Sequence, residues 1–361
     1  MTKFSIQCLV FLLAFTTLNP STLRGEDDGP VSSWQSIPNN AFAFVYVDLN
    51  ALGDSPTLQI PREMVAGIES ELNTVFENQI GIRPTELFDA TFVVPTFQSA
   101  ITGMESSTAP GFLLVSFTSP VNVQKISQSL GNEWERRNVN GQDAFVHGDA
   151  DRVIFHHSEN TLALGKGESV QWFIDNRGNE EFTNLSDAMV EAEYGQIIAC
   201  VDSSLIPKEM SQFLPSELSG FANTNFAAIS LDLVSVITFN AVLDFESVDD
   251  AKGVSRVANA KLEEGRRMLG GMETSALQAL VQTQNDIESS IEPLSLLAAV
   301  RYGQKLLGDA EVQRFRNRVL THIGVEGVDG TMLIGIVPAA LAAIGSEANA
   351  QFTAISDELE N

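Results

Sequence analysis

Two aspartates occupy the same place in two similar stretches of the sequence. Asp48 ends the apolar run AFAFVYVD, and Asp202 ends the run GQIIACVD. Two carboxylates that met in a cleft would form an acid–base pair or ligate a metal ion. A carboxylate at a strand end also accepts backbone N–H groups two or three residues on, and so begins a turn or helix. Because capping needs only one local carboxylate, we interpret both as caps in a module used twice, and the carboxylate pair is the alternative.

The histidines supply the second candidate constellation. His147 and His156 flank the segment GDAD in a predicted β-hairpin. On a shared face, two imidazoles together with Asp149 or Asp151 would form a divalent metal site. No third ligand with suitable spacing follows, so we favour the interpretation of two exposed histidines on a hairpin and keep the metal site as the alternative.

Other sequence motifs do not support a known chemistry. The stretch LALGKGES places Lys166 before its second glycine, which is not the spacing of a phosphate-binding loop. The sequence contains no GxSxG, HExxH, paired CxxC or calcium-loop pattern. Cys200 lies in the apolar run IIACV and is expected to be a buried small hydrophobe. We therefore expect no catalytic residue and no cofactor, and keep Asp48, Asp202, His147 and His156 as the candidate site residues of the alternatives.

The N-terminus has the pattern of a signal peptide. Lys3 precedes a short apolar stretch, and Gly25 is the best cleavage position. We expect residues 1–25 to be removed and the protein to be secreted or periplasmic, in the cell envelope. The alternative is an uncleaved anchor, which would make the protein a membrane-tethered scaffold. The later apolar stretch MLIGIVPAALAAIG is too short to span a bilayer, so no transmembrane span is expected in the mature chain.

The charge of the chain restricts its partners. The 361 residues carry a formal charge of −26, and loss of Lys3 and Arg24 with the leader makes it two units more negative. Such a surface repels phosphate backbones, so nucleic acid is excluded as a partner. With 44% hydrophobic residues, the chain has enough apolar side chains for a large core.

Alternating β-like and helical patterns predict an α+β fold with two similar halves of mixed sheet and helix. Turn residues and hydrophobic periodicity delimit the strands and helices. Among them are predicted strands over 43–49, 197–201 and 331–337 and predicted helices over 62–79 and 168–175. The predicted organisation is a signal peptide at 1–25, a linker at 26–40, a first half at 41–190, a second half at 191–344 and a polar tail at 345–361.

The second half contains a predicted helical insertion at 250–321. Its segments are expected to include helices over 249–269, 275–288, 294–307 and 311–321. Arg314, Arg316 and Arg318 would spread around the last of these helices and pair with acidic side chains. Leu- and Ala-rich faces of the insertion would pack on the sheet or form a protruding helical pair.

Three stretches carry a resemblance to known sequences: IPNNAFAFVYVDLNAL, VSFTSPVNVQKISQSL and TLALGKGESVQWFIDN. After a signal peptide, this order resembles a group of secreted bacterial proteins without an established activity. The resemblance implies an exported α+β protein with repeated units, and no site residue is carried over from it.

These observations favour an exported, acidic, non-catalytic protein that binds a protein partner or has a structural role in the envelope. The helices of 250–321 are the expected partner-binding segment. The alternative is a hydrolase with a carboxylate or histidine–carboxylate site in a cleft between the halves.

Overall fold

The computed structural model describes residues 32–54, 86–106, 111–130, 132–148, 151–179, 181–192, 195–208, 223–233, 237–283 and 287–325. The predicted signal peptide, the helix expected at 62–79, the last predicted strand at 331–337 and the polar tail lie outside the described residues.

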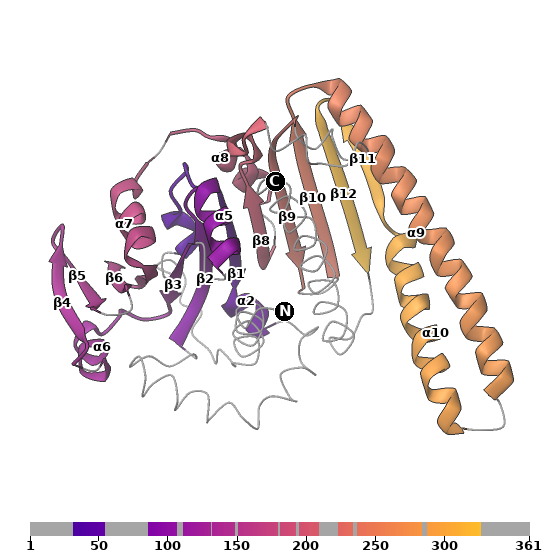
Figure 1. The fold of residues 1–361 in the computed structure, drawn as a ribbon, viewed down its shortest axis with the longest axis horizontal. Coiled ribbons are helices and arrows are strands. Elements are labelled where there is room, and N and C mark those ends of the chain that lie inside the picture. The colour runs from indigo at the N-terminus through magenta and orange to yellow at the C-terminus, as the bar shows by residue number, and fades with distance from the viewer. Residues whose placement is uncertain are drawn as a thin grey trace, which may run out of the picture.

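The described strands form a single antiparallel sheet, accompanied by helices, so the fold is of the α+β class (Figure 1). The order across the sheet is β11-β12-β10-β9-β8-β1-β2-β3-β7-β6-β5-β4. The strands are β1 (Ala43–Asp48), β2 (Leu87–Val94), β3 (Phe112–Phe117), β4 (Trp134–Val139), β5 (Gln142–His147), β6 (Arg152–Ser158), β7 (Thr161–Lys166), β8 (Ile197–Val201), β9 (Thr224–Asp232), β10 (Ile237–Phe245), β11 (Glu311–Phe315) and β12 (Arg318–Val325). The helical elements are η1 (Ser33–Ser36), α2 (Leu49–Asp54), α5 (Phe97–Ser106), α6 (Val123–Ser129), α7 (Gly167–Asn176), α8 (Asn184–Glu191), η5 (Ser203–Leu205), α9 (Val248–Thr283) and α10 (Ile287–Gly308).

The pair β1 and β8, near the middle of the sheet, joins the two predicted halves. Val45 lies opposite Ala199 in this antiparallel pair. From it, β1-β2-β3 extend in one direction and β8-β9-β10 in the other, each as an antiparallel meander. The halves therefore share one continuous sheet.

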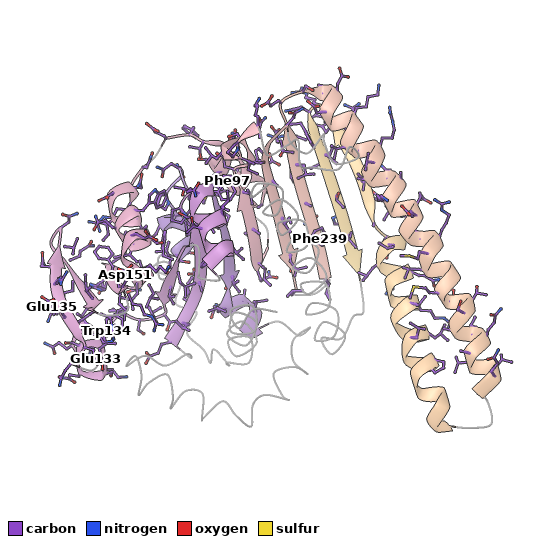
Figure 2. All side chains as sticks on the ribbon, in the orientation of Figure 1. Phe97, Glu133, Trp134, Glu135, Asp151 and Phe239 are labelled. Carbon is purple, nitrogen blue, oxygen red and sulfur yellow. The ribbon has the colours of Figure 1, made fainter. Side chains whose placement is uncertain are left out.

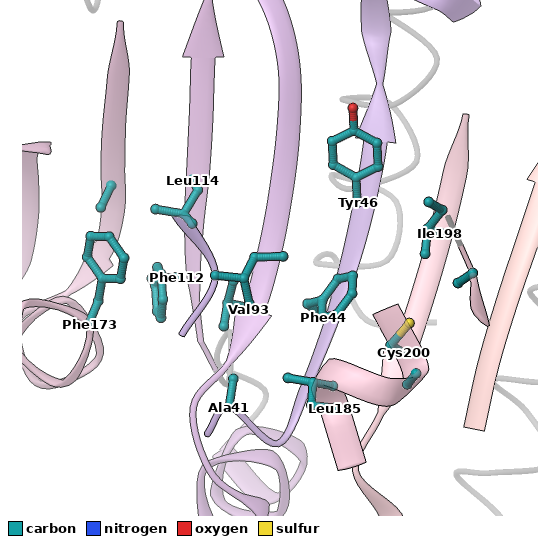
Figure 3. Close-up of a cluster of buried hydrophobic side chains, with 14 of the residues drawn as sticks. Ala41, Phe44, Tyr46, Val93, Phe112, Leu114, Phe173, Leu185, Ile198 and Cys200 are labelled. Atoms are coloured by element: carbon teal, nitrogen blue, oxygen red, sulfur yellow. The ribbon is translucent and has the colours of Figure 1, made fainter. Parts of the chain in front are cut away.

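One face of the sheet carries the largest apolar cluster (Figure 3). Phe44 and Phe112 come from the strands, Phe173 from α7 and Leu185 from α8, and all four are buried. The starts of both helices are stabilised locally: Glu168 lies in the first turn of α7, where negative charge is favoured, and Thr183 forms a capping box at α8. Burial of these side chains holds the two helices on the sheet.

Smaller apolar clusters lie along the sheet. One joins Leu52 of α2 to Val47, and another joins Ile126 of α6 to Phe145. A third cluster places Val254 of α9 against Val319 of β12, which anchors the beginning of that long helix.

A close backbone approach at the start of β3 requires glycine. A Cβ at Gly111 would lie 1.9 Å from the carbonyl oxygen of Val93 in β2. Any side chain there would force the two strands apart.

The prediction of helix over 311–321 is wrong. This segment forms the hairpin β11–β12, whose turn contains Arg316 with φ +56°. Arg314, Arg316 and Arg318 therefore lie on strands and a turn. Arg318 Nε donates to Asp244 of β10 at 2.9 Å, and its guanidinium also pairs with Glu191 of α8. The pairing of Arg318 with acidic residues was thus correct, although the expected helix was not.

The helical insertion is a two-helix hairpin that ends at Gly308. The segments predicted separately over 249–269 and 275–288 belong mostly to the continuous helix α9. Figure 1 shows α9 running along the β11 edge of the sheet and extending, together with α10, beyond the strand ends. The protruding helical pair was one of the two arrangements considered, and it is the one observed.

Candidate protein-interaction surface

Asp48 and Asp202 cap the turns that follow their strands. The carboxylate of Asp48 accepts the backbone N–H of Ala51 at 2.8 Å, in the first turn of α2. Asp202 accepts the N–H of Ser204 at 3.1 Å and begins η5. Each interaction satisfies an N–H group at a helical start. The capping interpretation is confirmed at both positions.

The two carboxylates lie at opposite ends of the central strand pair. Asp48 N–H bonds to the carbonyl of Gln196, whereas Asp202 N–H bonds to the carbonyl of Phe42. Six residues of strand between these levels correspond to roughly 20 Å. Paired catalytic carboxyl groups lie within about 10 Å of each other. The antiparallel register therefore holds Asp48 and Asp202 too far apart to act as a pair. The alternative of a shared carboxylate site formed by these two residues is wrong.

His147 and His156 also do not converge. His147 lies opposite Arg152, so His156 is four residues further along β6, or roughly 13 Å away. His147 Nε2 lies 3.0 Å from a carboxylate oxygen of Glu133, and its ring packs edge-on against Trp134. Within the described ranges, no group of three or more His, Cys, Asp or Glu side chains is placed to hold a metal ion. The metal-site alternative is not supported there; Asp149 lies outside the described residues.

The interpretation of exposed hairpin histidines also requires correction. The side chain of His147 is only 17% exposed. The Nε2 atom of His156 is buried and has no hydrogen-bond partner. The tertiary packing of the hairpin against its neighbours accounts for this burial, which local sequence does not reveal.

His157, on the opposite face of β6, has a strongly perturbed environment. Its ring packs edge-on against the ring of Phe173 in α7, with 5.0 Å between the two ring centroids. Burial lowers the pKa of His157 to about 4, and the positive charges of Arg177 and His156 add to the effect. Arg177 lies over the ring of Phe155, 5.2 Å from its centroid. The imidazole is therefore neutral at physiological pH.

A buried carboxylate that sequence analysis missed lies beside Asp48. Asp89 of β2 is opposite Asp48 in register and is buried. It accepts the backbone N–H of Ser33 at 3.1 Å and the hydroxyl of Ser32. Burial raises the pKa of Asp89, and burial together with the two carboxylates raises the pKa of Tyr46. These hydrogen bonds tie η1 to the sheet, which is a structural role.

Cys200 is buried in the core of β8, as expected. Burial raises the pKa of its thiol to about 12. A thiol that stays protonated at neutral pH is a poor nucleophile, so Cys200 is a packing residue.

The α9–α10 hairpin is held by one defined seam. Leu307 packs over Gly265, Leu269 packs over Gly303, and Ala276 is buried. Glu273 accepts hydrogen bonds from Arg301 at 3.0 Å and from Gln304 at 2.9 Å. This spacing of three and four residues uses one side of α9.

Arg266 closes the proximal end of the seam. Its guanidinium donates to the carbonyls of Leu307 at 2.8 Å and Ala310 at 3.0 Å. The bond to Leu307 satisfies a carbonyl group at the C-terminus of α10, where the last carbonyls have no partner within the helix, and Ala310 follows just after the helix end. Side-chain packing and hydrogen bonds therefore hold α9 and α10 against each other.

The other side of distal α9 presents uncharged side chains to solvent. We call residues 268–283 the distal segment; Glu273 is its one charged residue. Figure 2 shows side chains projecting from this part of the hairpin, beyond the end of the sheet. The exposed apolar side chains of the distal hairpin, with their exposed fractions, are Met268 (63%), Met272 (39%), Leu277 (41%), Val281 (66%) and Leu296 (40%). Leu277 and Val281, four residues apart, lie together on one flank of α9, and neighbouring exposed apolar side chains are typical of an interaction surface.

The hairpin is also nearly neutral in a strongly acidic chain. Residues 248–308 contain seven cationic and eight acidic side chains, while the whole chain has a formal charge of −26. Almost all of the net negative charge therefore lies outside the hairpin. Depletion of charged residues is a compositional feature of interface centres, and within the hairpin it is the distal segment, with Glu273 as its one charged residue, that has it.

Comparison with known proteins does not identify a family. The sequence matches no protein-family model and no curated protein. One solved structure, described as "Structure of crystal form I of TP0453", aligns with a TM-score of 0.34 and 8% identity. The alignment covers 88% of this chain and 99% of that chain.

In the part of the chain that the structure describes, no helix combines the length and the hydropathy needed to cross a membrane. This holds for α9 and α10, the two longest helices.

Proposed function

We propose that this chain is an exported, non-catalytic protein that binds a protein partner through the distal half of the α9–α10 hairpin. The observation that carries the proposal is the uncharged, exposed outer side of residues 268–283 on a chain of charge −26. Solvation alone would favour charged side chains on a protruding helix. A partner that covered Leu277 and Val281, which lie four residues apart on one flank of α9, would remove apolar surface from water.

Site-specific photo-crosslinking in the natural host tests this function. A photoreactive residue at Gln278, which is exposed in the distal segment, should give a discrete adduct. The same residue at Arg256, exposed on proximal α9, is the matched control and should give none. Leu277→Glu should abolish the adduct at position 278, because the partner would have to bury a carboxylate. Equal labelling at the two positions, or no adduct at either, would contradict the proposed binding surface.

Export to the envelope or the medium is part of the proposal and rests on the sequence of residues 1–25. N-terminal sequencing of the protein recovered outside the cytoplasm should begin close to Glu26. Recovery of the chain with Met1 still present in a membrane fraction would favour the tethered scaffold instead.

We further propose that the two halves arose by duplication. The central pair β1–β8, the two outward meanders and the capping aspartates support this origin. Superposition of β1-β2-β3 on β8-β9-β10 in an experimental structure should relate them by a two-fold axis at Val45 and Ala199. A fit that places Asp48 and Asp202 at unequal positions would refute the duplication.

A further inference from the structure

The outer side of distal α9 has small residues at its centre. Gly271, Thr274 and Ser275 are exposed, and no atom of the residues that the structure describes lies within 4 Å of a Cβ placed on Gly270 or Gly271. Each glycine within a helix costs about 1 kcal/mol relative to alanine. Contacts within the described residues do not offset this cost. A second helix that packed closely on this side would use the space that both glycines leave.

The distal segment is also remote from the acidic part of the molecule. Residue 268 follows the start of α9 by 20 residues, which corresponds to roughly 30 Å of helix. The Debye length is about 8 Å at physiological ionic strength. The repulsion that acidic sheet domains exert on each other is therefore largely screened where distal segments meet.

These observations point to a second copy of this chain as the partner. We infer that two hairpins pair through their distal segments, in an antiparallel arrangement around a two-fold axis near Thr274 and Ser275. This inference rests on the proposed function and specifies its partner. An uncharged surface has no electrostatic complementarity to an acidic or a basic protein. A second copy of the hairpin presents the same neutral surface with small residues at its centre. A two-fold arrangement also closes the assembly at a dimer and leaves the acidic domains at opposite ends.

Sedimentation equilibrium of the purified full chain tests the dimer. The wild-type chain should reach twice its 39.1 kDa mass at micromolar concentration. The double variant Leu277→Glu, Val281→Glu should raise the dimer dissociation constant at least about 100-fold, because four carboxylates would enter the interface. Val248→Glu, an equally apolar and exposed position at the proximal end of α9, is the matched control and should leave the dimer intact.

Gly271→Ala separates association from folding. Alanine should raise the thermal stability of the hairpin, because it is the better helix former. In the dimer its methyl group would meet the opposing helix, so the dissociation constant should rise at the same time. A rise in stability with unchanged association would overturn close packing at this position.

A wild-type chain that stays monomeric at 100 µM would overturn the inference, as would a dimer unaffected by the two glutamates. The adduct at Gln278 keeps this failure distinct from that of the proposed function. An adduct of twice the chain mass supports the second copy; one of another mass overturns it while the binding function stands.

Discussion

Acidification should weaken this fold through His157. Its ring is packed against Phe173, and its pKa in the folded protein is lowered to about 4, chiefly by burial. The unfolded chain has a pKa of about 6.5 at this side chain. As the pH falls below 6.5, the unfolded chain binds the proton first, so the free energy of unfolding decreases until the pH reaches about 4.

The size of the effect follows from the difference between these two pKa values. Between pH 7 and pH 5 the linkage relation gives a loss of about 1.8 kcal/mol. Because the imidazole is only partly buried, solvent screening reduces this to about 1 to 1.5 kcal/mol. The lower limit of pH 5 stays above the isoelectric point of about 4.3. At the isoelectric point the net charge is zero, which promotes precipitation.

Urea unfolding followed by circular dichroism measures the effect. The wild type, His157→Gln and His322→Gln should be compared at both pH values. His157→Gln should lose about 1 to 1.5 kcal/mol less than the wild type on acidification. His322 is exposed and bonds to Asn240, so its variant should follow the wild type. An equal loss in the wild type and His157→Gln would refute the assignment.

Three further substitutions test the packing. Burial raises the pKa of Asp89 above its ordinary value of 3.8, so in urea unfolding the stability of Asp89→Asn relative to the wild type should increase as the pH rises above that value; a decrease would contradict this. Gly111→Ala should lower the free energy of unfolding by about 3 kcal/mol through its clash with β2, while Gly253→Ala, in open space on α9, should not destabilise. Arg318→Met should cost about 2 kcal/mol in thermal unfolding, because it leaves the nearly buried Asp244 without its cation; an unchanged midpoint would show that the pair is energetically neutral.

The sequence predicted those strands, helices and caps that depend on interactions between residues close together in the chain. The capping aspartates, the strands around Val45 and Ala199 and the helix that begins near Gly167 all follow from side-chain periodicity and turn chemistry. The strand β4 was missed, although Asn140 and Gly141 both have positive φ and form the strongest hairpin signal in a sequence.

Other features depend on contacts between distant residues. The hairpin β11–β12 turns at Arg316, a residue type that rarely adopts positive φ, so its sequence lacks a turn signal. Burial of Asp89 depends on Ser32 and Ser33, which precede it by more than fifty residues. The charge-poor distal segment is visible in the sequence, but its exposure becomes clear only once α10 is placed on one side of α9.

The position of β1 has a consequence for how the chain folds. Its partner β8 is synthesised only after roughly 150 further residues have emerged. Until then, a meander of β1, β2 and β3 presents an apolar strand with open backbone groups, which is a template for aggregation. Closure of the sheet must await this late, long-range contact, and such contacts slow folding. A chain interrupted before Ile197 would retain that exposed strand, so truncated forms should be recovered in inclusion bodies.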